Sequence, residues 1–294
     1  RQPDHYCSLD TTLSMAAKAY SAAKKIDTKT HPKKLIGIAV TASLATNYSK
    51  KGDHKFFIAI QTHKYSHSFS YQFTKGELSR DQEEAIVTKY IIDALSGACG
   101  INDGVQNQTP NLRIEKVKAE KSWIKLVDGK IEFISSSNQI PELIFPGSFN
   151  PLHSGHAEMS ELAEKKTGLS PAYEICIQNA DKPPLSYHEI QRTVLQFSQS
   201  YDWVLTKAGK FSDKAKLFPN SVFIIGADTL TRMLDEKFYL NRKDMLDQLD
   251  LFNSHNINFL VFGRKIKKTF ISLDSVQIPE HIENRFTGFG EEIF

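Results

Sequence analysis

The stretch FPGSFNPLHSGH, residues 145–156, carries two histidines three positions apart, after a run rich in Gly, Ser, Asn and Pro. The apolar segment ELIF ends where this run begins, so we expect a strand, a turn, and then a helix from about Ser154. His153 and His156 would lie on the same side of the helix start, where free backbone N–H groups attract anions. Imidazole N–H groups could join these donors, so the pattern indicates a phosphate-binding site. The structural alternative is that His153 caps the helix and His156 is a partly exposed helix residue.

Short apolar strands alternate with helices from Glu142 onward. The expected strands are ELIF, AYEICIQ, DWVLT, SVFIIG and INFLVFG, and the helices include SGHAEMSELAEKK, SYHEIQRTVLQFSQS, a short piece after DWVLT, LTRMLDEKFY and RKDMLDQLDLFNS. This alternation predicts an α/β fold with a parallel sheet that is covered by helices on both faces. Ligands of such sheets lie outside the carboxyl ends of the strands, where the histidine pair falls. Ser186, with Glu189 three residues later, predicts a capping box for the second helix.

The first hundred residues show a different pattern. Apolar residues at helical spacing predict a helix from Asp10 to Lys25, and LIGIAVTASL, KFFIAIQTH and SFSYQF are typical of strands. A second helix is expected from Arg80 to Leu95, ending before Gly97. The Gly-, Asn- and Gln-rich stretch after it is typical of a linker. In WIKLVDGKIEFI, Asp128-Gly129 lies between two apolar runs and predicts a tight hairpin.

Length and composition limit the classes of protein. With 294 residues the chain is long enough for two modest domains. We expect a smaller α/β domain over residues 1–118, a hairpin and connection over 119–141, and the parallel-sheet domain over 142–294. The net charge of +3, from 37 basic and 34 acidic residues, gives no global field that would favour nucleic acid or a membrane surface as a partner. No apolar run approaches the roughly 18 residues that a membrane helix needs.

The cysteines bear on the compartment. Cys7, Cys99 and Cys176 lie far apart with no CxxC pair, which fits neither a disulfide framework nor a zinc site. We therefore expect no protein-bound metal at cysteines, a reducing compartment and a cytoplasmic protein. The sequence leaves the oligomeric state open, a homo-oligomer included.

GSFNPLHSGH resembles the (H/T)xGH signature of the nucleotidylyltransferase superfamily, in the GxFxPxHxGH form of nicotinate or nicotinamide mononucleotide adenylyltransferases. Two further segments are similar to that family and occur in the expected order. IQNADKPPLS, after the second strand, resembles its substrate loop, and FIIGADTLTRM, after the fourth, resembles its GxD segment. The resemblance covers about Glu142 to Arg264. It implies a Rossmann-like nucleotidylyltransferase domain, preceded by the smaller α/β domain.

The resemblance implies transfer of AMP from ATP to the phosphate of nicotinate or nicotinamide mononucleotide, with release of pyrophosphate, as in NAD biosynthesis. A phosphate nucleophile is already anionic, so the protein has to position the reactants and stabilise charge. His153 and His156 would hold the ATP phosphates and the transition state, and Lys182 would offset triphosphate charge. The alternative for Lys182 is a solvated loop lysine. Magnesium is expected to accompany ATP, held mainly by phosphates and water, because the sequence offers no dedicated carboxylate cage.

Further binding residues follow from the same resemblance. On the nucleotide side it implies Gly147, Ser148, Phe149, Gly155 and Arg264, and on the substrate side Asn179, Gly226, Asp228 and Thr229. Asp228 has a structural alternative, as the cap of a helix that starts at Thr229 or Leu230. Arg264 could likewise be a solvated arginine at a strand end. Because the motif binds the ATP side, pantetheine phosphate or another phosphorylated acceptor stays open.

The sequence departs from the family in one place. Members usually carry an ISSTxIR-like segment after the last strand, whose Ser, Thr and Arg bind the ATP phosphates. Here Ile271-Ser272-Leu273 differs from it, and the sequence ends with GEEIF at 290–294. Since the first residue is Arg1 rather than Met, we expect truncation at both ends. The alternative hypothesis is a catalytically degenerate protein that binds nucleotides or regulates another activity.

The first region resembles the C-terminal domain of the competence-damage protein family, some of whose members deamidate nicotinamide mononucleotide. LIGIAVTASLATN, KKGDHKFFIAIQT and the helix after Arg80 carry the resemblance, from about Asp10 to Leu95. The SCTGG-type nucleophile segment of that family is absent, so we expect this half to be inactive in the chain. Ser43 and Lys51 could be a nucleophile and its helper, but a structural role is favoured for both.

Overall fold

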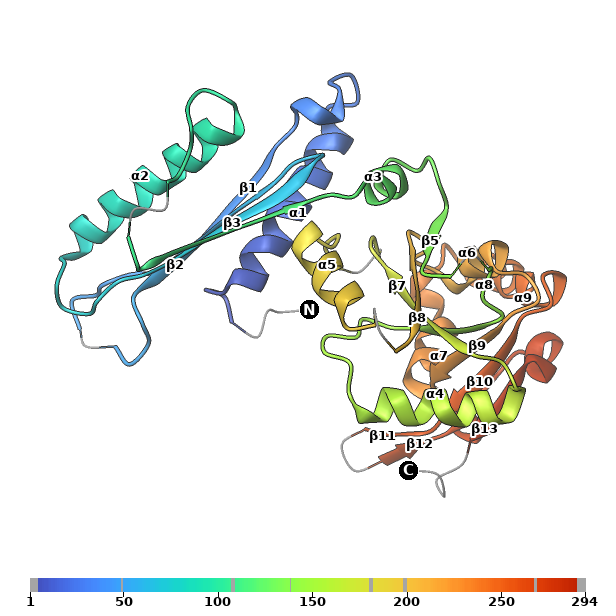
Figure 1. Cartoon of the computed structure of the whole chain (residues 1–294). Coiled ribbons are helices and arrows are strands. Elements are labelled where there is room, and N and C mark those ends of the chain that lie inside the picture. Colours follow the sequence, from blue (N-terminus) through green and yellow to red (C-terminus); the bar gives the residue numbers. More distant parts are fainter. Residues whose placement is uncertain are drawn as a thin grey trace. The chain divides into compact units, whose positions relative to one another are not determined.

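The computed structural model describes residues 5–48, 50–106, 109–137, 139–179, 182–197, 200–266 and 269–289 (Figure 1). Arg1 and the GEEIF segment lie outside the described residues, as do two positions of IQNADKPPLS. The chain forms two compact units, Arg1–Lys125 with Ala180–Arg192, and Leu126–Asn179 with Thr193–Phe294. The segment 180–192, which the sequence placed in the second domain, thus groups with the first unit. Among the described residues, no helix combines the length and the apolar character needed to cross a membrane.

The first unit is built on a four-stranded antiparallel sheet in the order β1-β2-β3-β4. Its strands are β1 (Gly37–Ser43), β2 (Lys55–Gln61), β3 (Tyr65–Gln72) and β4 (Leu112–Lys118). The three predicted strands are confirmed. Strand β4 was not predicted, because charged residues interrupt its apolar alternation and it follows the linker-like stretch.

Two long helices cover opposite faces of this sheet (Figure 1). They are α1 (Leu9–Ile26) and α2 (Arg80–Ala98), with the short turn η1 (Pro32–Lys34) between α1 and β1. Leu13 of α1 packs with Ala59, and Val87 of α2 packs with Ile58. Neighbouring residues of a strand face opposite sides, so β2 supplies both cores. Helix α2 continues beyond the predicted end before Gly97, whose missing side chain permits close contact with Gly104: an added Cβ would lie 2.5 Å from the Gly104 Cα.

The predicted hairpin at Asp128-Gly129 is wrong. Its first run belongs to helix α3 (Lys121–Val127), in which Trp123 and Leu126, three residues apart, are both buried. Its second run gives the short strand β5 (Phe133–Ser135), which pairs antiparallel with a different strand, β8 (Asp202–Thr206). The Asp-Gly pair does mark a turn, since Gly129 has a φ of 72°. The two buried residues are three positions apart, which is helical spacing and differs from the alternation of a strand. The turn signal alone did not decide between a helix and a strand.

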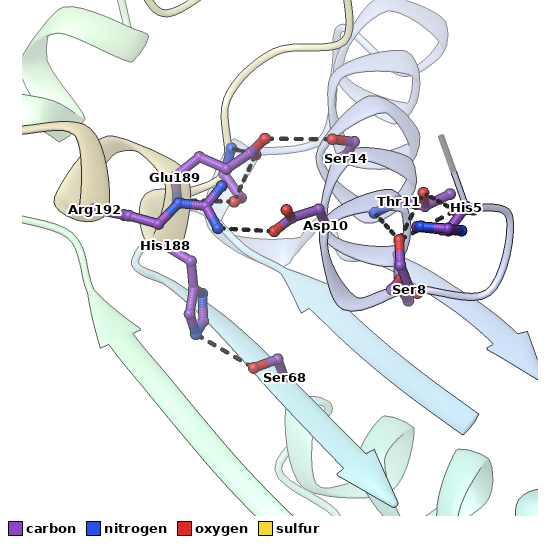
Figure 2. A network of polar contacts seen from close by, with 11 residues as sticks. His5, Ser8, Asp10, Thr11, Ser14, Ser68, His188, Glu189 and Arg192 are labelled. Carbon is purple, nitrogen blue, oxygen red and sulfur yellow. Dashed lines mark hydrogen bonds and ion pairs between the residues drawn. The ribbon is translucent and has the colours of Figure 1, made fainter. Parts of the chain in front are cut away.

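Helix α5 (Tyr187–Leu195) starts within the first unit, where Figure 2 shows its polar contacts. The predicted capping box is confirmed: Ser186 N donates to Glu189 Oε2 at 2.8 Å, and Glu189 N donates to Ser186 Oγ at 3.3 Å. Ser14 of α1 also donates to Glu189 Oε1, at 3.4 Å. Burial raises the pKa of the Glu189 carboxyl, against the effect of these hydrogen bonds.

Further contacts bind the same helix start to the first unit. Tyr187 is buried; its N–H donates to Ser66 Oγ of β3 at 2.8 Å. Arg192 pairs with Asp10 of α1 at 2.9 Å (Figure 2). Within the first unit, α5 is therefore joined to α1 by a part-buried and an exposed polar contact, and to β3 by a buried one.

The second unit contains a seven-stranded sheet in the order β13-β10-β9-β6-β7-β8-β5. Its further strands are β6 (Leu143–Pro146), β7 (Pro171–Cys176), β8 (Asp202–Thr206), β9 (Val222–Gly226), β10 (Asn258–Phe262) and β13 (Phe286–Phe289). All neighbours pair in parallel except β5 with β8, which confirms the predicted parallel α/β architecture.

Helices and short turns connect these strands. They are α4 (Ser154–Thr167), α6 (Phe211–Leu217), α7 (Ala227–Met233), α8 (Arg242–Leu249) and α9 (Leu251–Ser254), with 3-10 turns at Glu236–Phe238, Leu273–Ser275 and Glu280–Arg285. A hairpin of β11 (Arg264–Ile266) and β12 (Thr269–Ile271) follows β10. The helix expected over LTRMLDEKFY ends at Met233, and its last residues form the first of those turns instead. Phe223, Phe252 and Phe259 are among the large residues of the main core.

Candidate active site

The chain turns between strand β6 and helix α4 through residues 147–153, which we call the histidine turn. Gly147 N donates to the carbonyl of Glu174 on β7 at 3.0 Å, which fixes the turn to the sheet edge. The Asn150–Pro151 peptide bond is cis. Phe149 adopts a left-handed backbone with φ of 42°, and its side chain is only 2% exposed. A Cβ at position 147 would lie 2.4 Å from the Phe149 ring, so glycine is needed there for the ring, whereas the sequence suggested a ligand.

The Phe149 ring belongs to an aromatic cluster. It makes edge-to-face contacts with Phe145, Tyr173 and Phe197 at centroid distances of 5.5, 5.1 and 5.5 Å. Such arrangements favour a fixed ring orientation. The ring is therefore part of the core, and any contact between Phe149 and a nucleotide would come from its main chain.

The two histidines come together at the start of α4. Their rings stack with centroids 3.7 Å apart and an interplanar angle of 29°, which confirms that they lie on the same side of the helix start. The main chain supports this arrangement, because His156 N donates to His153 O at 3.0 Å and His153 N donates to His156 Nδ1 at 3.3 Å. His153 is exposed and His156 is half-buried.

The environment of His156 favours the neutral imidazole. Burial lowers the pKa of His156 to about 4, and the nearby charges of His153 and Arg264 add to this effect. Phe149 and Phe145 border the ring, with centroids at 5.1 and 5.8 Å. Since Nδ1 accepts a hydrogen bond from His153 N, the proton of the neutral ring lies on Nε2. His156 thus has one ring N–H with which to donate to an anion.

Gly155 makes room for the His153 ring. A Cβ at this position would lie 3.3 Å from His153 Nδ1 and 3.4 Å from its Cε1, tight enough to displace the ring by a few tenths of an ångström. The glycine of the motif thus has a local role in the stacking of the two imidazoles.

Two more predicted residues come from the neighbouring strand ends. Because the sheet order is β10-β9-β6, the carboxyl ends of these three strands are adjacent. Asp228 lies in the first turn of α7 after β9, and Arg264 follows β10; Arg264 Nη1 lies 3.2 Å from Asp228 Oδ2. Gly226 occupies the cap position of α7, which starts at Ala227, so the structural alternative of Asp228 as the cap of this helix is wrong. A Cβ at Gly226 would lie 2.5 Å from Asp228 Oδ1.

The other predicted residues come from several segments. Ser148 is exposed in the histidine turn, Asn179 is half-buried beyond β7, and Thr229 is half-buried in the first turn of α7. Lys182 is exposed and belongs to the segment that groups with the first unit, so the structure does not assign it to the histidine pair.

Sequence reasoning missed a buried ion pair near the same sheet edge. Glu174 of β7 is 1% exposed; its Oε2 lies 2.7 Å from Lys214 Nζ of α6. Thr206 of β8 donates to the other carboxylate oxygen at 2.5 Å, and Lys214 also donates to the carbonyl of Ala208 at 2.7 Å. The glutamate within the apolar run AYEICIQ was the signal that a buried partner exists. The pair braces strands β7 and β8 against helix α6.

A possible nucleophile in the first unit has a different environment. Lys50, and not Lys51, approaches Ser43: its Nζ lies 2.9 Å from Ser43 Oγ and 2.5 Å from Leu44 O. Both contacts use the ammonium as a donor, so they close the loop after β1. Across the part of the chain that the structure describes, no group of three or more His, Cys, Asp or Glu residues is arranged to hold a metal ion.

Sequence comparisons agree with the fold of the second unit. Residues 144–285 match the cytidylyltransferase-like family. A protein of Schizosaccharomyces pombe named "Putative nicotinamide mononucleotide adenylyltransferase" is 30% identical over 156 residues, which cover 49% of this chain and 61% of the relative. The aligned part therefore spans less than two thirds of that relative. Together with the parallel sheet, both similarities support the nucleotidyltransferase superfamily for residues 144–285.

Proposed function

We propose that the second unit transfers AMP from ATP to the phosphate of nicotinate or nicotinamide mononucleotide and releases pyrophosphate. The observation that carries the proposal is the stacked imidazole pair at the start of α4. Arg264, which follows strand β10, adds a positive charge whose effect on the pKa of His156 comes after those of burial and His153. A nucleoside triphosphate is the class of ligand that suits two imidazoles, a guanidinium and a helix start together. The name of the S. pombe relative favours the pyridine mononucleotide as acceptor.

The reaction makes limited demands on the protein. The acceptor phosphate oxygen attacks the α-phosphorus of ATP, the bond from that phosphorus to the bridging oxygen breaks, and pyrophosphate leaves with the electron pair. The nucleophile is already anionic, so no group has to remove a proton from it. His156 Nε2–H would donate to the α-phosphoryl oxygens, where charge accumulates, and His153 would bind the leaving phosphates beside it. Arg264 would supply a permanent positive charge to the same phosphates.

Magnesium enters the proposal with the nucleotide. Phosphate oxygens and water would provide most of its ligands. The ion would offset phosphate charge, while the residues of the chain orient the reacting groups.

For the first unit we propose a structural role without amidase activity. Lys50 donates to Ser43 Oγ and to the Leu44 carbonyl, which uses these groups to close the loop after β1. Incubation of the protein with nicotinamide mononucleotide alone, followed by an assay for ammonia, should give no product. Ammonia release that Ser43→Ala abolishes would reverse this assignment.

The test of the main proposal is a product assay. The protein is incubated with magnesium and either ATP or CTP, together with nicotinamide mononucleotide, nicotinate mononucleotide or pantetheine phosphate, and products are identified by mass. We expect a dinucleotide and pyrophosphate with ATP and a pyridine mononucleotide. A product only with CTP or with pantetheine phosphate would replace the proposed substrate. Nucleotide binding without turnover for every acceptor would support the catalytically degenerate alternative, for which the departure at Ile271-Ser272-Leu273 is the observation.

A further inference from the structure

Gln196, in the turn that directly follows helix α5, makes two hydrogen bonds to the histidine turn. Its side-chain oxygen accepts from Leu152 N at 2.8 Å, and its side-chain nitrogen donates to Phe149 O at 3.0 Å. Gln196 lies 44 residues beyond Leu152 in the sequence, and all three residues belong to the second unit. The turn is therefore fixed by a side chain that no local sequence pattern connects to it.

We propose that Gln196 is a positioning residue, whose amide holds the histidine turn in the conformation that stacks the two imidazoles. Leu152 directly precedes His153, so the accepted hydrogen bond fixes the main chain at the entry to the pair. Phe149 contacts the second histidine of the pair, since the ring centroids of Phe149 and His156 are 5.1 Å apart. The two contacts of one amide thus reach both histidines.

The turn needs such support because of its backbone. A non-glycine residue in the left-handed region, such as Phe149 with φ of 42°, costs on the order of 1 kcal/mol or more and persists only where its surroundings fix it. Burial of the Phe149 ring supplies part of the compensation, and the hydrogen bond from Gln196 to its carbonyl supplies another part. Without the amide, the peptide groups from 149 to 152 could rotate toward common conformations and move His153.

The backbone of Gln196 is held in place by its neighbours. Its N–H donates to the carbonyl of Thr193 at 3.2 Å, and the next residue, Phe197, is fully buried and contacts both Phe149 and Tyr173. A side chain on a fixed backbone loses less entropy when it binds the turn. The amide can therefore fix the position of the histidine turn relative to the sheet and its aromatic cluster.

Only an amide of this length satisfies both groups of the turn. Leu152 offers a donor and Phe149 an acceptor, so the partner needs one acceptor and one donor side by side. Glutamate keeps the size and the acceptor, but it places a second carboxylate oxygen against the Phe149 carbonyl. Leucine keeps approximate size and removes both hydrogen bonds. These two variants separate the loss of packing from the loss of the bonds.

The test compares Gln196→Glu and Gln196→Leu with Gln191→Leu, which makes the same change on an exposed residue of α5. The first readout is the NMR titration of the His156 ring, which needs no turnover. Its pKa of about 4 in the intact protein depends on burial and on the charges of His153 and Arg264. We expect the pKa of His156 to rise toward its ordinary value in Gln196→Leu, which adds no charge, and to stay in place in Gln191→Leu. In Gln196→Glu the new carboxylate adds an upward effect of its own, so the leucine variant decides. Circular dichroism and melting curves establish that each variant is folded.

The second readout is nucleotidyl transfer, and this part rests on the proposed function. We expect kcat to fall about tenfold in Gln196→Leu, with a smaller change in the KM for the acceptor, because displacement of a transition-state donor by a fraction of an ångström has that order of effect. If the intact protein has no transferase activity but the His156 titration shifts as expected, the proposed function fails and the positioning role stands. A folded Gln196→Leu protein whose His156 titration and kcat both match the intact protein would overturn the inference.

Discussion

The histidine turn after β6 and the loop after β1 both follow an apolar strand and both contain polar residues that chemistry could use. They differ in what holds those residues. In the loop after β1, Lys50 donates to Ser43 and to a carbonyl, while Glu83 binds the Ala45 N–H at 2.6 Å and His54 Nδ1 at 2.7 Å. Polar atoms are thus bonded to one another, and the loop is stabilised by them.

In the histidine turn, contacts with aromatic rings and with the main chain hold the polar residues instead. Phe149, Phe145 and the His153 ring orient His156, and Gln196 binds peptide groups of the turn. Ring faces and backbone position the imidazoles, so Nε2 of His156 can serve a ligand.

The largest expected effect comes from His156→Ala. Removal of a single donor to a developing oxyanion typically lowers the rate by about 100- to 1,000-fold, and we expect kcat for pyrophosphate release to fall by that order. The control is Ser43→Ala at the end of β1, for which kcat should remain within about twofold, since that residue has no role in the proposed reaction. Equal rates for His156→Ala and the intact protein would erase the distinction between the two regions.

Glu83→Ala tests the polar contacts that stabilise the loop after β1. Glu83 is fully buried, and its removal leaves the Ala45 N–H and His54 without their partner, so we expect the free energy of unfolding to fall by about 2–4 kcal/mol. Denaturant melts followed by circular dichroism measure the change. The neighbouring Glu84, which forms an exposed pair with Arg80, provides the matched control: Glu84→Ala should cost no more than about 0.5 kcal/mol. Similar losses for the two variants would contradict the structural role assigned to Glu83.

Gly155→Ala should separate stability from activity within the histidine turn. Alanine in a helix is favoured over glycine by about 1 kcal/mol, so melting should be unchanged or shifted upward. The new Cβ would press on the His153 ring, 3.3 Å from Nδ1, and we expect kcat to fall roughly fivefold to tenfold. Steady-state kinetics and melting curves on the same preparation test both signs. Higher stability with full activity would mean that the position of the His153 ring is unimportant.

The pH dependence of stability gives the smallest and most gradual effect. Burial lowers the pKa of His156 in the second unit and of His67 in the first to about 4, from an ordinary value of 6.5. The unfolded chain then binds more protons between these pH values, so the stabilising contribution is complete above pH 6.5 and is lost as the pH falls toward 4. His153 and Arg264 face His156, whereas Lys116 and His188 face His67.

Single histidine replacements measured by denaturant melts at pH 5 and pH 7.5 test this. Both His156→Gln and His67→Gln should reduce the difference in the free energy of unfolding between the two pH values. Saturating ATP should also raise the pKa of His156 in an NMR titration, because phosphates stabilise the imidazolium, and leave that of His67 unchanged. A rise in the pKa of both His156 and His67 would mean that ATP also binds outside the histidine turn.

Much of the second unit could be predicted from sequence because its signals are local. The strand SVFIIG, the helix SGHAEMSELAEKK and the shared side of His153 and His156 all follow from periodicity within a dozen residues. The contacts of Gln196 with Leu152, and of Glu174 with Lys214, join residues 44 and 40 positions apart, so only the folded sheet brings them together. Local signals also failed where they conflicted, as at Asp128-Gly129, where a turn signal adjoined a run that packs as a helix.

The grouping of residues 1–125 with 180–192 has a consequence for any attempt to divide the protein. Neither continuous half of the sequence encodes the first unit. A fragment that stops at Lys125 would lack Tyr187 and leave Ser66 of β3 without the N–H that it accepts. A protein fragment that ends at Lys125 should be insoluble or partly unfolded. Addition of a separate peptide covering residues 182–192 should restore its cooperative unfolding.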